Sequence, residues 1–228
     1  MATVAGSNTI AFGPIMLRRV PYRVYARLSD QEENNHLRMT YHDGTLEIMS
    51  PKYRHERASS RIGMVVRAVV SELGIPCASS ASTTFRRAGT GPFKGMGKEP
   101  DESFYITYES LIRDKDEIDL DAGDPPPDLW IEVDNRASSL GKPRVCAALG
   151  TPEVWRYRAR KKSLDFLILT DGGTYEPIER SRCLPMLTPA LVMEALAMCE
   201  GSSESAWDLR LRAWVRNTLA PPRPEGGV

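Results

Sequence analysis

Cysteine is scarce in this sequence, and long apolar runs are missing from it. The four cysteines, Cys77, Cys146, Cys183 and Cys199, are widely spaced and form no CxxC pair, which disfavours both a zinc site and a disulfide scaffold. No run reaches the roughly 18 apolar residues that a membrane span needs, and the N-terminus lacks the basic and apolar regions of a signal peptide. We therefore expect a cytoplasmic protein with free thiols and no membrane segment.

The sequence also lacks an excess of charge of either sign, because 30 Lys and Arg residues balance 30 Asp and Glu residues. Bulk attraction cannot then hold a nucleic acid, so any such binding must be local. Basic residues gather in segments 52–67 and 156–162, whereas segment 99–124 holds ten acids against two bases. Two basic segments could bracket a phosphate backbone, although basic helix faces are commonly just solvated.

Length and composition favour one globular domain, since the chain has 228 residues of which 41% are hydrophobic. Residues 1–20 show no clear period, and the tail APPRPEGGV is mostly Pro, Gly and polar groups. We expect a loose segment over 1–20, a folded domain over 21–218 and a disordered tail over 219–228.

Hydrophobic periodicity predicts an α+β fold in which helices flank a mixed β-sheet. The clearest elements are a β-hairpin over 37–49, which turns at His42-Asp43-Gly44, and an amphipathic helix over 54–73, which ends at Gly74. The Gly-rich stretch 88–97 is interpreted as a loop. The remaining predicted elements are strands at 76–80, 82–87, 101–106, 128–133, 153–159 and 164–169 and helices at 139–149, 188–199 and 205–217.

Acidic residues interrupt two apolar strands where apolar side chains would pack better. Alternation along the strand over 128–134 puts Trp130, Glu132 and Asp134 on one face. Burying an unpaired carboxylate costs several kcal/mol or more, so these acids need a cation, a proton or a hydrogen-bond network. With Asp101 from the neighbouring strand, they would form an all-oxygen donor set that suits Mg²⁺, and Lys142 could fold back over it.

A plainer interpretation of the same acids stays open. They could lie at strand ends, satisfied by solvent or by arginine partners such as Arg136 and Arg144. Trp130, Trp155 and Tyr157 could stack on bases, but aromatic residues in strands more often belong to the core.

Several motifs together resemble the PD-(D/E)xK nuclease superfamily and, within it, the restriction endonuclease branch that is abundant in cyanobacteria. The resemblance spans about residues 37–158. It is carried by TYHDGTLEIMSP (40–51), HE (55–56), STTFRR (82–87), EPDESFYI (99–106), PPDLWIEVD (126–134) and ALGTPEVWRY (148–157).

The resemblance implies that Asp101 and Glu132 bind the metal, which would be Mg²⁺ with Mn²⁺ as the alternative ion. The superfamily's simplest pattern has its lysine two residues after the second acid, where this chain has Asp134. The branch that this chain resembles carries the lysine in the following helix, which makes Lys142 its counterpart. Glu47 corresponds to a further acid near the metal in related nucleases, and His55 is expected to support the site.

The leading hypothesis is therefore a Mg²⁺-dependent endonuclease, a hydrolase that cleaves phosphodiester bonds of DNA. Resembling nucleases cut two strands with paired sites, so we expect a homodimer. The rival hypothesis is a non-catalytic DNA-binding or assembly protein that keeps the nuclease fold, because fold alone does not fix function.

Overall fold

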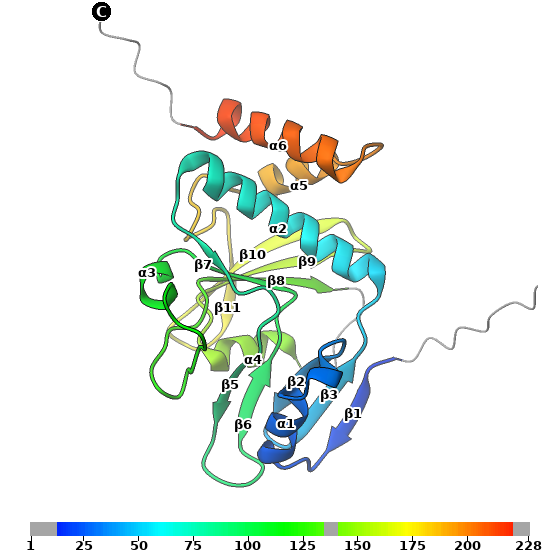
Figure 1. The fold of residues 1–228 in the computed structure, drawn as a ribbon, viewed down its shortest axis with the longest axis vertical. Coiled ribbons are helices and arrows are strands. Elements are labelled where there is room, and N and C mark those ends of the chain that lie inside the picture. Colours follow the sequence, from blue (N-terminus) through cyan, green and yellow to red (C-terminus); the bar gives the residue numbers. More distant parts are fainter. Residues whose placement is uncertain (1–12, 135–140, 221–228) are drawn as a thin grey trace, which may run out of the picture.

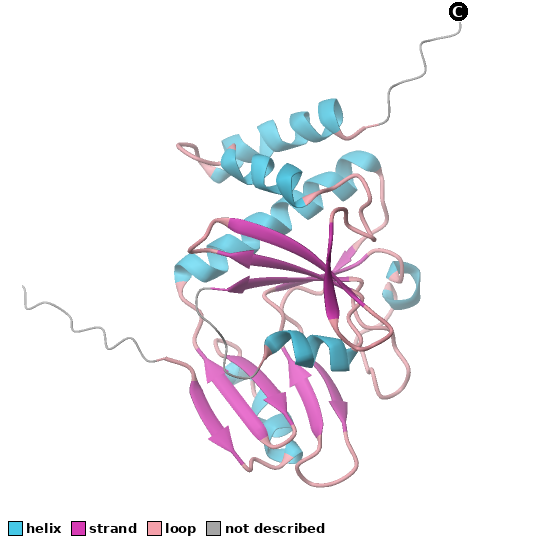
Figure 2. Ribbon diagram, turned by 180° about the vertical axis from the view of Figure 1, so that it is seen from behind, coloured by secondary structure: helices cyan, strands magenta, loops and turns pink. Residues whose placement is uncertain are grey.

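The computed structural model describes residues 13–134 and 141–220, which form two β-sheets and the helices around them (Figure 1). The remaining residues, among them Arg136 and nearly all of the predicted tail, lie outside the described residues. Along the longest axis, helices gather at one end, the two sheets follow one after the other, and a helix lies between the sheets (Figure 2).

The first sheet is antiparallel throughout and has the strand order β1-β3-β2-β6-β5. It contains the predicted hairpin, whose turn residues Asp43 and Gly44 have φ angles of 42° and 85°. Positive φ at both positions is the requirement of the two-residue turn that best fits the twist of a hairpin. The strands are β1 (Ile15–Arg18), β2 (Arg38–His42), β3 (Thr45–Met49), β5 (Phe85–Ala88) and β6 (Gly95–Lys98).

The second sheet is mixed and has the strand order β11-β10-β9-β8-β7-β4. Its central strands β8 and β9 run parallel and are connected through helix α4 (Lys142–Leu149), while the other described pairs are antiparallel. The strands are β4 (Ala78–Ser79), β7 (Glu102–Tyr105), β8 (Leu129–Asp134), β9 (Glu153–Arg158), β10 (Ser163–Leu169) and β11 (Tyr175–Ile178).

Helices cover both faces of the second sheet. On one face, Leu129, Ile131 and Val133 of β8 join a core with α2 (Tyr53–Leu73), α5 (Pro189–Ala197) and α6 (Glu204–Thr218). On the other face, Trp130 packs with residues of α4 and with Phe85 of the first sheet. Helix α4 thus lies between the two sheets. The shorter helices are α1 (Tyr22–Ser29), the 3₁₀ turn η1 (Glu32–Asn34) and α3 (Glu109–Ile112).

The predicted α+β class is confirmed, as are the hairpin, the long helix ended by Gly74 and the alternation of β8. Trp130 and Trp155 are fully buried, so they are core residues and cannot stack on bases. Two sheets take the place of the single mixed sheet that was expected. Strand β1 falls in the segment where no element was predicted, and α1, α3 and β11 were also missed.

The interpretation of 88–97 as a loop holds for residues 89–94 but was wrong at its ends, because Ala88 belongs to β5 and because β6 starts at Gly95 and pairs with both β2 and β5. Glycine is favoured there by packing. A Cβ at Gly97 would lie 2.1 Å from the hydroxyl of Tyr25, and one at Gly95 would lie 2.6 Å from the ring of Tyr22. The tyrosines of α1 lie so close to this face of β6 that only glycine fits at positions 95 and 97.

None of the helices among residues 13–134 and 141–220 is both long enough and apolar enough to cross a membrane.

Because α1 lies so close to β6, a larger residue at Gly97 should destabilise the fold. Gly97→Ala should lower the free energy of unfolding by about 1–3 kcal/mol, as overpacking of a tight core does. The matched control is Gly13→Ala, because a Cβ at Gly13 meets nothing within 4 Å. Urea denaturation of both variants measures the difference, and equal stability of the two would contradict the packing of Tyr25 on the strand.

Candidate functional site

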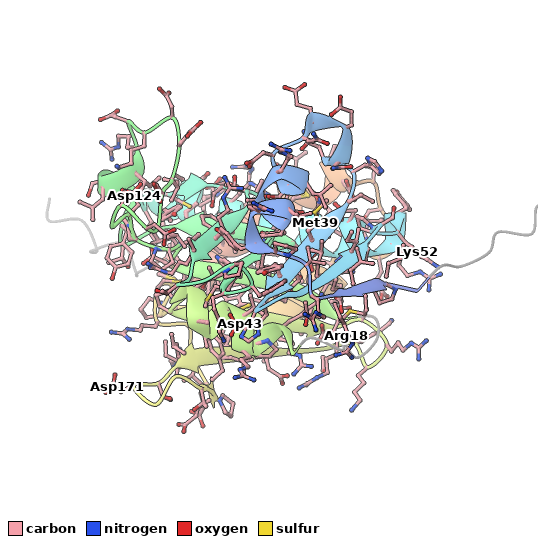
Figure 3. The ribbon with its side chains drawn as sticks, turned by 90° about the horizontal axis from the view of Figure 1, so that it is seen from below. Arg18, Met39, Asp43, Lys52, Asp124 and Asp171 are labelled. Carbon is pink, nitrogen blue, oxygen red and sulfur yellow. The ribbon has the colours of Figure 1, made fainter. Side chains whose placement is uncertain are left out.

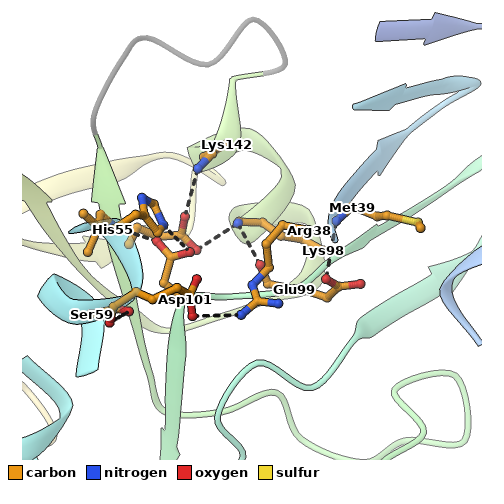
Figure 4. Close-up of polar contacts among 11 residues, drawn as sticks. Arg38, Met39, His55, Ser59, Lys98, Glu99, Asp101 and Lys142 are labelled. Atoms are coloured by element: carbon orange, nitrogen blue, oxygen red, sulfur yellow. Dashed lines mark hydrogen bonds and ion pairs between the residues drawn. The ribbon is translucent and has the colours of Figure 1, made fainter. Parts of the chain in front are cut away.

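Asp101 and Glu132 lie side by side where the two sheets meet. Glu102 of β7 pairs with Ile131 of β8 in an antiparallel register, so the next step along the ladder sets Asp101 opposite Glu132. Directly opposite residues of an antiparallel pair share a face. Both residues are buried, with exposed fractions of 8% and 3%. Asp101, directly before β7, and Glu132 of β8 therefore belong to one buried cluster. Figure 4 labels Asp101 together with His55, Lys98 and Lys142.

Both oxygens of the Asp101 carboxylate have partners. The Nε2 atom of His55, in the first turn of α2, lies 2.8 Å from Oδ1, and the backbone N–H of Val133 donates to Oδ2 over 2.7 Å. Burial raises the pKa of the Asp101 carboxyl, but the hydrogen bond with His55 and the charges of Lys142 and Lys98 act against burial and hold this pKa well below its usual range.

Two lysines approach the Glu132 carboxylate from different sides. The Nζ atom of Lys98 lies 2.9 Å from Oε1, and the Nζ atom of Lys142 lies 3.7 Å from Oε2. Lys142 is the first residue of α4, as the sequence predicted, and its side chain is 14% exposed. Lys98 is only 2% exposed. Burial lowers the pKa of Lys98, but the acidic groups around it, Glu132 first and Asp101 among the others, together outweigh burial, so the net change of this pKa is upward.

Lys98 is the site residue that the sequence reasoning missed. It ends β6, three residues before Asp101, and its ammonium also donates to the backbone carbonyl of Glu99 over 3.2 Å. The sequence did contain a signal for Lys98. A lysine ends the segment Gly95–Lys98, directly before the acidic motif that starts at Glu99. It was hidden because the glycines of β6 were interpreted as a loop.

Glu47 lies farther along the same row of the first sheet. Thr40 of β2 pairs with Glu47 of β3 on one side and with Lys98 of β6 on the other. All three are buried, and the pairing puts their side chains on one face. Adjacent strands are about 4.8 Å apart, so Glu47 is two strand spacings from Lys98. It belongs to the polar row that leads to the cluster.

Asp134 follows the plainer interpretation of the strand acids. Its carboxylate accepts a hydrogen bond of 2.5 Å from Nε of Arg156 on the neighbouring strand β9. The arginine partner is thus neither of the two that were named from the sequence. Arg144 lies exposed on α4, and Arg136 is outside the described residues.

A small cleft of about 20 Å³ lies beside Glu132 and Lys142, over β8, β9, β10 and β11. Its polar wall combines the lysine and glutamate with the Asp134–Arg156 pair and Tyr175, whose hydroxyl donates to the backbone carbonyl of Thr151 over 2.7 Å. Its lining is completed by Pro143, Cys146, Val154 and Leu167. Lys142 therefore faces the opening, whereas Lys98 lies on the inner side of Glu132.

The donor chemistry of the cluster fits a hard divalent cation. Within 13–134 and 141–220 no three His, Cys, Asp or Glu side chains are grouped as ligands for a metal ion. Mg²⁺ does not require three, because it keeps several waters and is commonly bound by one or two carboxylates together with substrate phosphates. Asp101 and Glu132 supply two neighbouring carboxylates of that kind.

The basic segments are less available than their sequence indicated. Arg57 and Arg61 of α2 both lie near Glu204 of α6, at 3.9 and 3.2 Å. Arg158 pairs with Asp165 within the second sheet. Much of the apparent local excess is thus neutralised by contacts distant in sequence. Seen from below, the acidic loop at Asp124 lies on the other side of the molecule from Arg18 and Lys52 (Figure 3).

Comparison with known proteins finds a matching family and matching solved structures. The family described as "Putative restriction endonuclease", Uma2, matches residues 24–198, which confirms the resemblance seen in the motifs. A matching crystal structure is that of "a putative nuclease belonging to DUF820" from Anabaena variabilis ATCC 29413. It has a TM-score of 0.42 and 16% identity, and the match covers 78% of this chain and 90% of that chain. Among curated proteins none matches.

The contact between His55 and Asp101 predicts a measurable coupling. A double-mutant cycle of His55→Ala and Asp101→Ala should give a coupling free energy of about 1.5–3 kcal/mol. Either single variant already loses the buried hydrogen bond to the charged carboxylate, so the double variant loses nothing more from that contact. Urea denaturation without added metal measures it. Exposed His36 provides the control, because His36→Ala and Asp101→Ala should be additive within about 0.5 kcal/mol. Additivity of the His55 pair would contradict the contact.

Proposed function

The chain belongs to the Uma2 family of restriction endonuclease-like proteins, and on that basis we propose that it is a Mg²⁺-dependent endonuclease that hydrolyses phosphodiester bonds of DNA. Family membership supports a nuclease that acts on nucleic acid. The observation that carries the finer proposal is the buried pair of Asp101 and Glu132, with Lys142 beside it at the mouth of a cleft.

Asp101 and Glu132 are the residues that would hold the ion. Asp101 is fixed from two directions, by His55 and by the backbone of Val133, so its carboxylate needs little reorganisation on binding. Mg²⁺, when bound, supplies positive charge against the scissile phosphate and makes water easier to deprotonate. His55 acts in this scheme as a positioning residue, because its Nε2 atom is directed at Asp101.

Lys142 is the residue proposed to act on the reacting groups. Its side chain lines the cleft, and its ammonium is 3.7 Å from Glu132, so it is tethered near the acids without being enclosed. In that position it orients the attacking water or stabilises the negative charge that develops on the phosphate. Loss of one such electrostatic group typically lowers turnover by about 10²–10³.

One observation favours the rival, a non-catalytic DNA-binding or assembly protein. Both oxygens of Glu132 already face a lysine ammonium, so the two acids are charge-balanced without a metal ion. A protein that had lost cleavage could keep such a cluster for stability alone. The two functions differ in whether purified protein nicks DNA when Mg²⁺ is added.

We predict that Lys142→Ala lowers nicking of supercoiled plasmid by about 10²–10³ while leaving Mg²⁺ affinity equal or higher, because it removes a charge that repels the cation. Glu132→Gln should abolish both nicking and Mg²⁺ binding. Glutamine is preferred to alanine at Glu132 because it fills the volume beside buried Lys98. Nicking assays and calorimetric titration with MgCl₂ measure the two effects.

The control for this pair is Lys94→Ala, since Lys94 is 61% exposed and pairs with Asp43 on the surface. It should nick at the wild-type rate. Wild-type nicking by Lys142→Ala would remove Lys142 from the mechanism. Absence of cleavage by the wild-type protein on every DNA and RNA substrate offered would favour the non-catalytic function.

We further propose that the protein acts as a homodimer, because two copies related by a two-fold axis present two sites to the two strands of a duplex. Light scattering at micromolar concentration should give about twice the mass of the chain, 25.4 kDa. A monomer that still makes double-strand breaks would contradict the paired-site arrangement.

A further inference from the structure

Lys98 holds Glu132 from the side opposite to the cleft. It comes from β6 of the first sheet, while Glu132 belongs to β8 of the second, so their 2.9 Å contact joins the two sheets. Lys98 is 2% exposed, and its cross-strand neighbours are Thr40 and Phe85, both buried. Lys98 is not among the described residues that line the cleft.

The charges of the cluster already sum to zero. The carboxylates of Asp101 and Glu132 contribute two negative charges, and the ammonium groups of Lys98 and Lys142 contribute two positive ones. Opposite charges at such short range inside a protein attract far more strongly than they do in water. A divalent cation that enters this cluster brings two further positive charges close to two ammonium groups.

Lys98 and Lys142 differ in how freely each can move away from Glu132, because they are buried to different extents. Lys142 is partly solvated and can swing toward the cleft, because its side chain is 14% exposed at the start of a helix. Lys98 is enclosed between the sheets and also donates to the carbonyl of Glu99. When a cation approaches Glu132, Lys142 can withdraw into solvent, but Lys98 cannot.

We propose that Lys98 is the resident counter-ion of Glu132: it fixes this carboxylate in the metal-free protein and competes with Mg²⁺ for it. Lys98 is thus a positioning residue that sets the metal affinity of the free protein. The proposal deepens the proposed function and rests on it in one respect, that Glu132 is a metal ligand.

The first experiment titrates the full-length protein with MgCl₂ alone, with no DNA present, and follows binding by calorimetry. Lys98→Met keeps the length and apolar stem of the side chain and removes its charge. It should bind Mg²⁺ at least tenfold more tightly than the wild type. The matched control Lys94→Met, at an exposed lysine directly before β6, should bind like the wild type. An affinity of Lys98→Met equal to or weaker than that of the wild type would overturn the proposal.

The second experiment measures the melting temperature with and without 10 mM MgCl₂. Without the ion, Lys98→Met leaves Glu132 short of one counter-charge and should melt several degrees below the wild type. With the ion, it should recover more than the wild type gains, because Mg²⁺ replaces the missing charge. A purely structural lysine would show the same deficit with and without Mg²⁺, and that result would overturn the proposal.

A double variant keeps the test sharp if Lys98→Met does not fold without metal. Lys98→Met with Glu132→Gln removes both charges at once and should fold and melt above Lys98→Met alone, because the uncompensated carboxylate is gone. If the double variant also fails to fold, position 98 needs lysine for another reason, and the proposal is overturned.

The failure of this inference is distinguishable from failure of the proposed function. Tighter Mg²⁺ binding by Lys98→Met in a protein that cleaves no nucleic acid would support the counter-ion role and contradict the nuclease. Efficient Mg²⁺-dependent cleavage by the wild type, with unchanged Mg²⁺ affinity in Lys98→Met, would support the nuclease and contradict the counter-ion role.

Discussion

The burial of two neighbouring carboxylates is the constraint on which the arrangement of this molecule depends. An unpaired buried carboxylate costs several kcal/mol, so each needs a cation or hydrogen-bond donors of fixed geometry. Each layer supplies a partner for these carboxylates: α2 carries His55, the first sheet carries Lys98, α4 begins with Lys142, and β8 contributes a backbone N–H. The cluster therefore adds polar contacts between elements that also meet in the hydrophobic cores, where Trp130 packs with α4 and with Phe85 of the first sheet.

The parallel pair β8 and β9 decides where this cluster can open to solvent. A parallel connection needs a crossover, and here α4 serves as the crossover and begins at the carboxyl end of β8. Ligands of parallel sheets bind at that end of the strands because the loops there leave it open. Glu132 lies near the end of its strand and Lys142 at the start of the helix, so the crossover delivers both to one cleft.

The features that depend on neighbouring residues in the sequence, such as strand alternation and the hairpin turn, could be predicted from the sequence. Alternation in β8 placed Glu132 on the face with Trp130, and Asp43-Gly44 fixed the hairpin turn because both residues accept positive φ. Two features depended on contacts far apart in sequence. Strand β6 was missed because its glycines are required by tyrosines of α1, about 70 residues earlier. Asp134 was grouped with the metal acids because its partner Arg156 comes from the strand beyond α4.

The balanced charge of the cluster bears on when a metal ion would be held. Two ammonium groups offset Asp101 and Glu132, so a divalent cation alone leaves the cluster with a net positive charge in a poorly solvated place. A phosphodiester carries one negative charge at the position where it would be cut. In the proposed function, ion and phosphate together would restore part of the charge balance that either would disturb alone, so their affinities would be coupled, and by thermodynamic linkage each would strengthen the binding of the other by the same factor. In the proposed nuclease, a protein without net charge gains its attraction for DNA locally, at the site that cuts it.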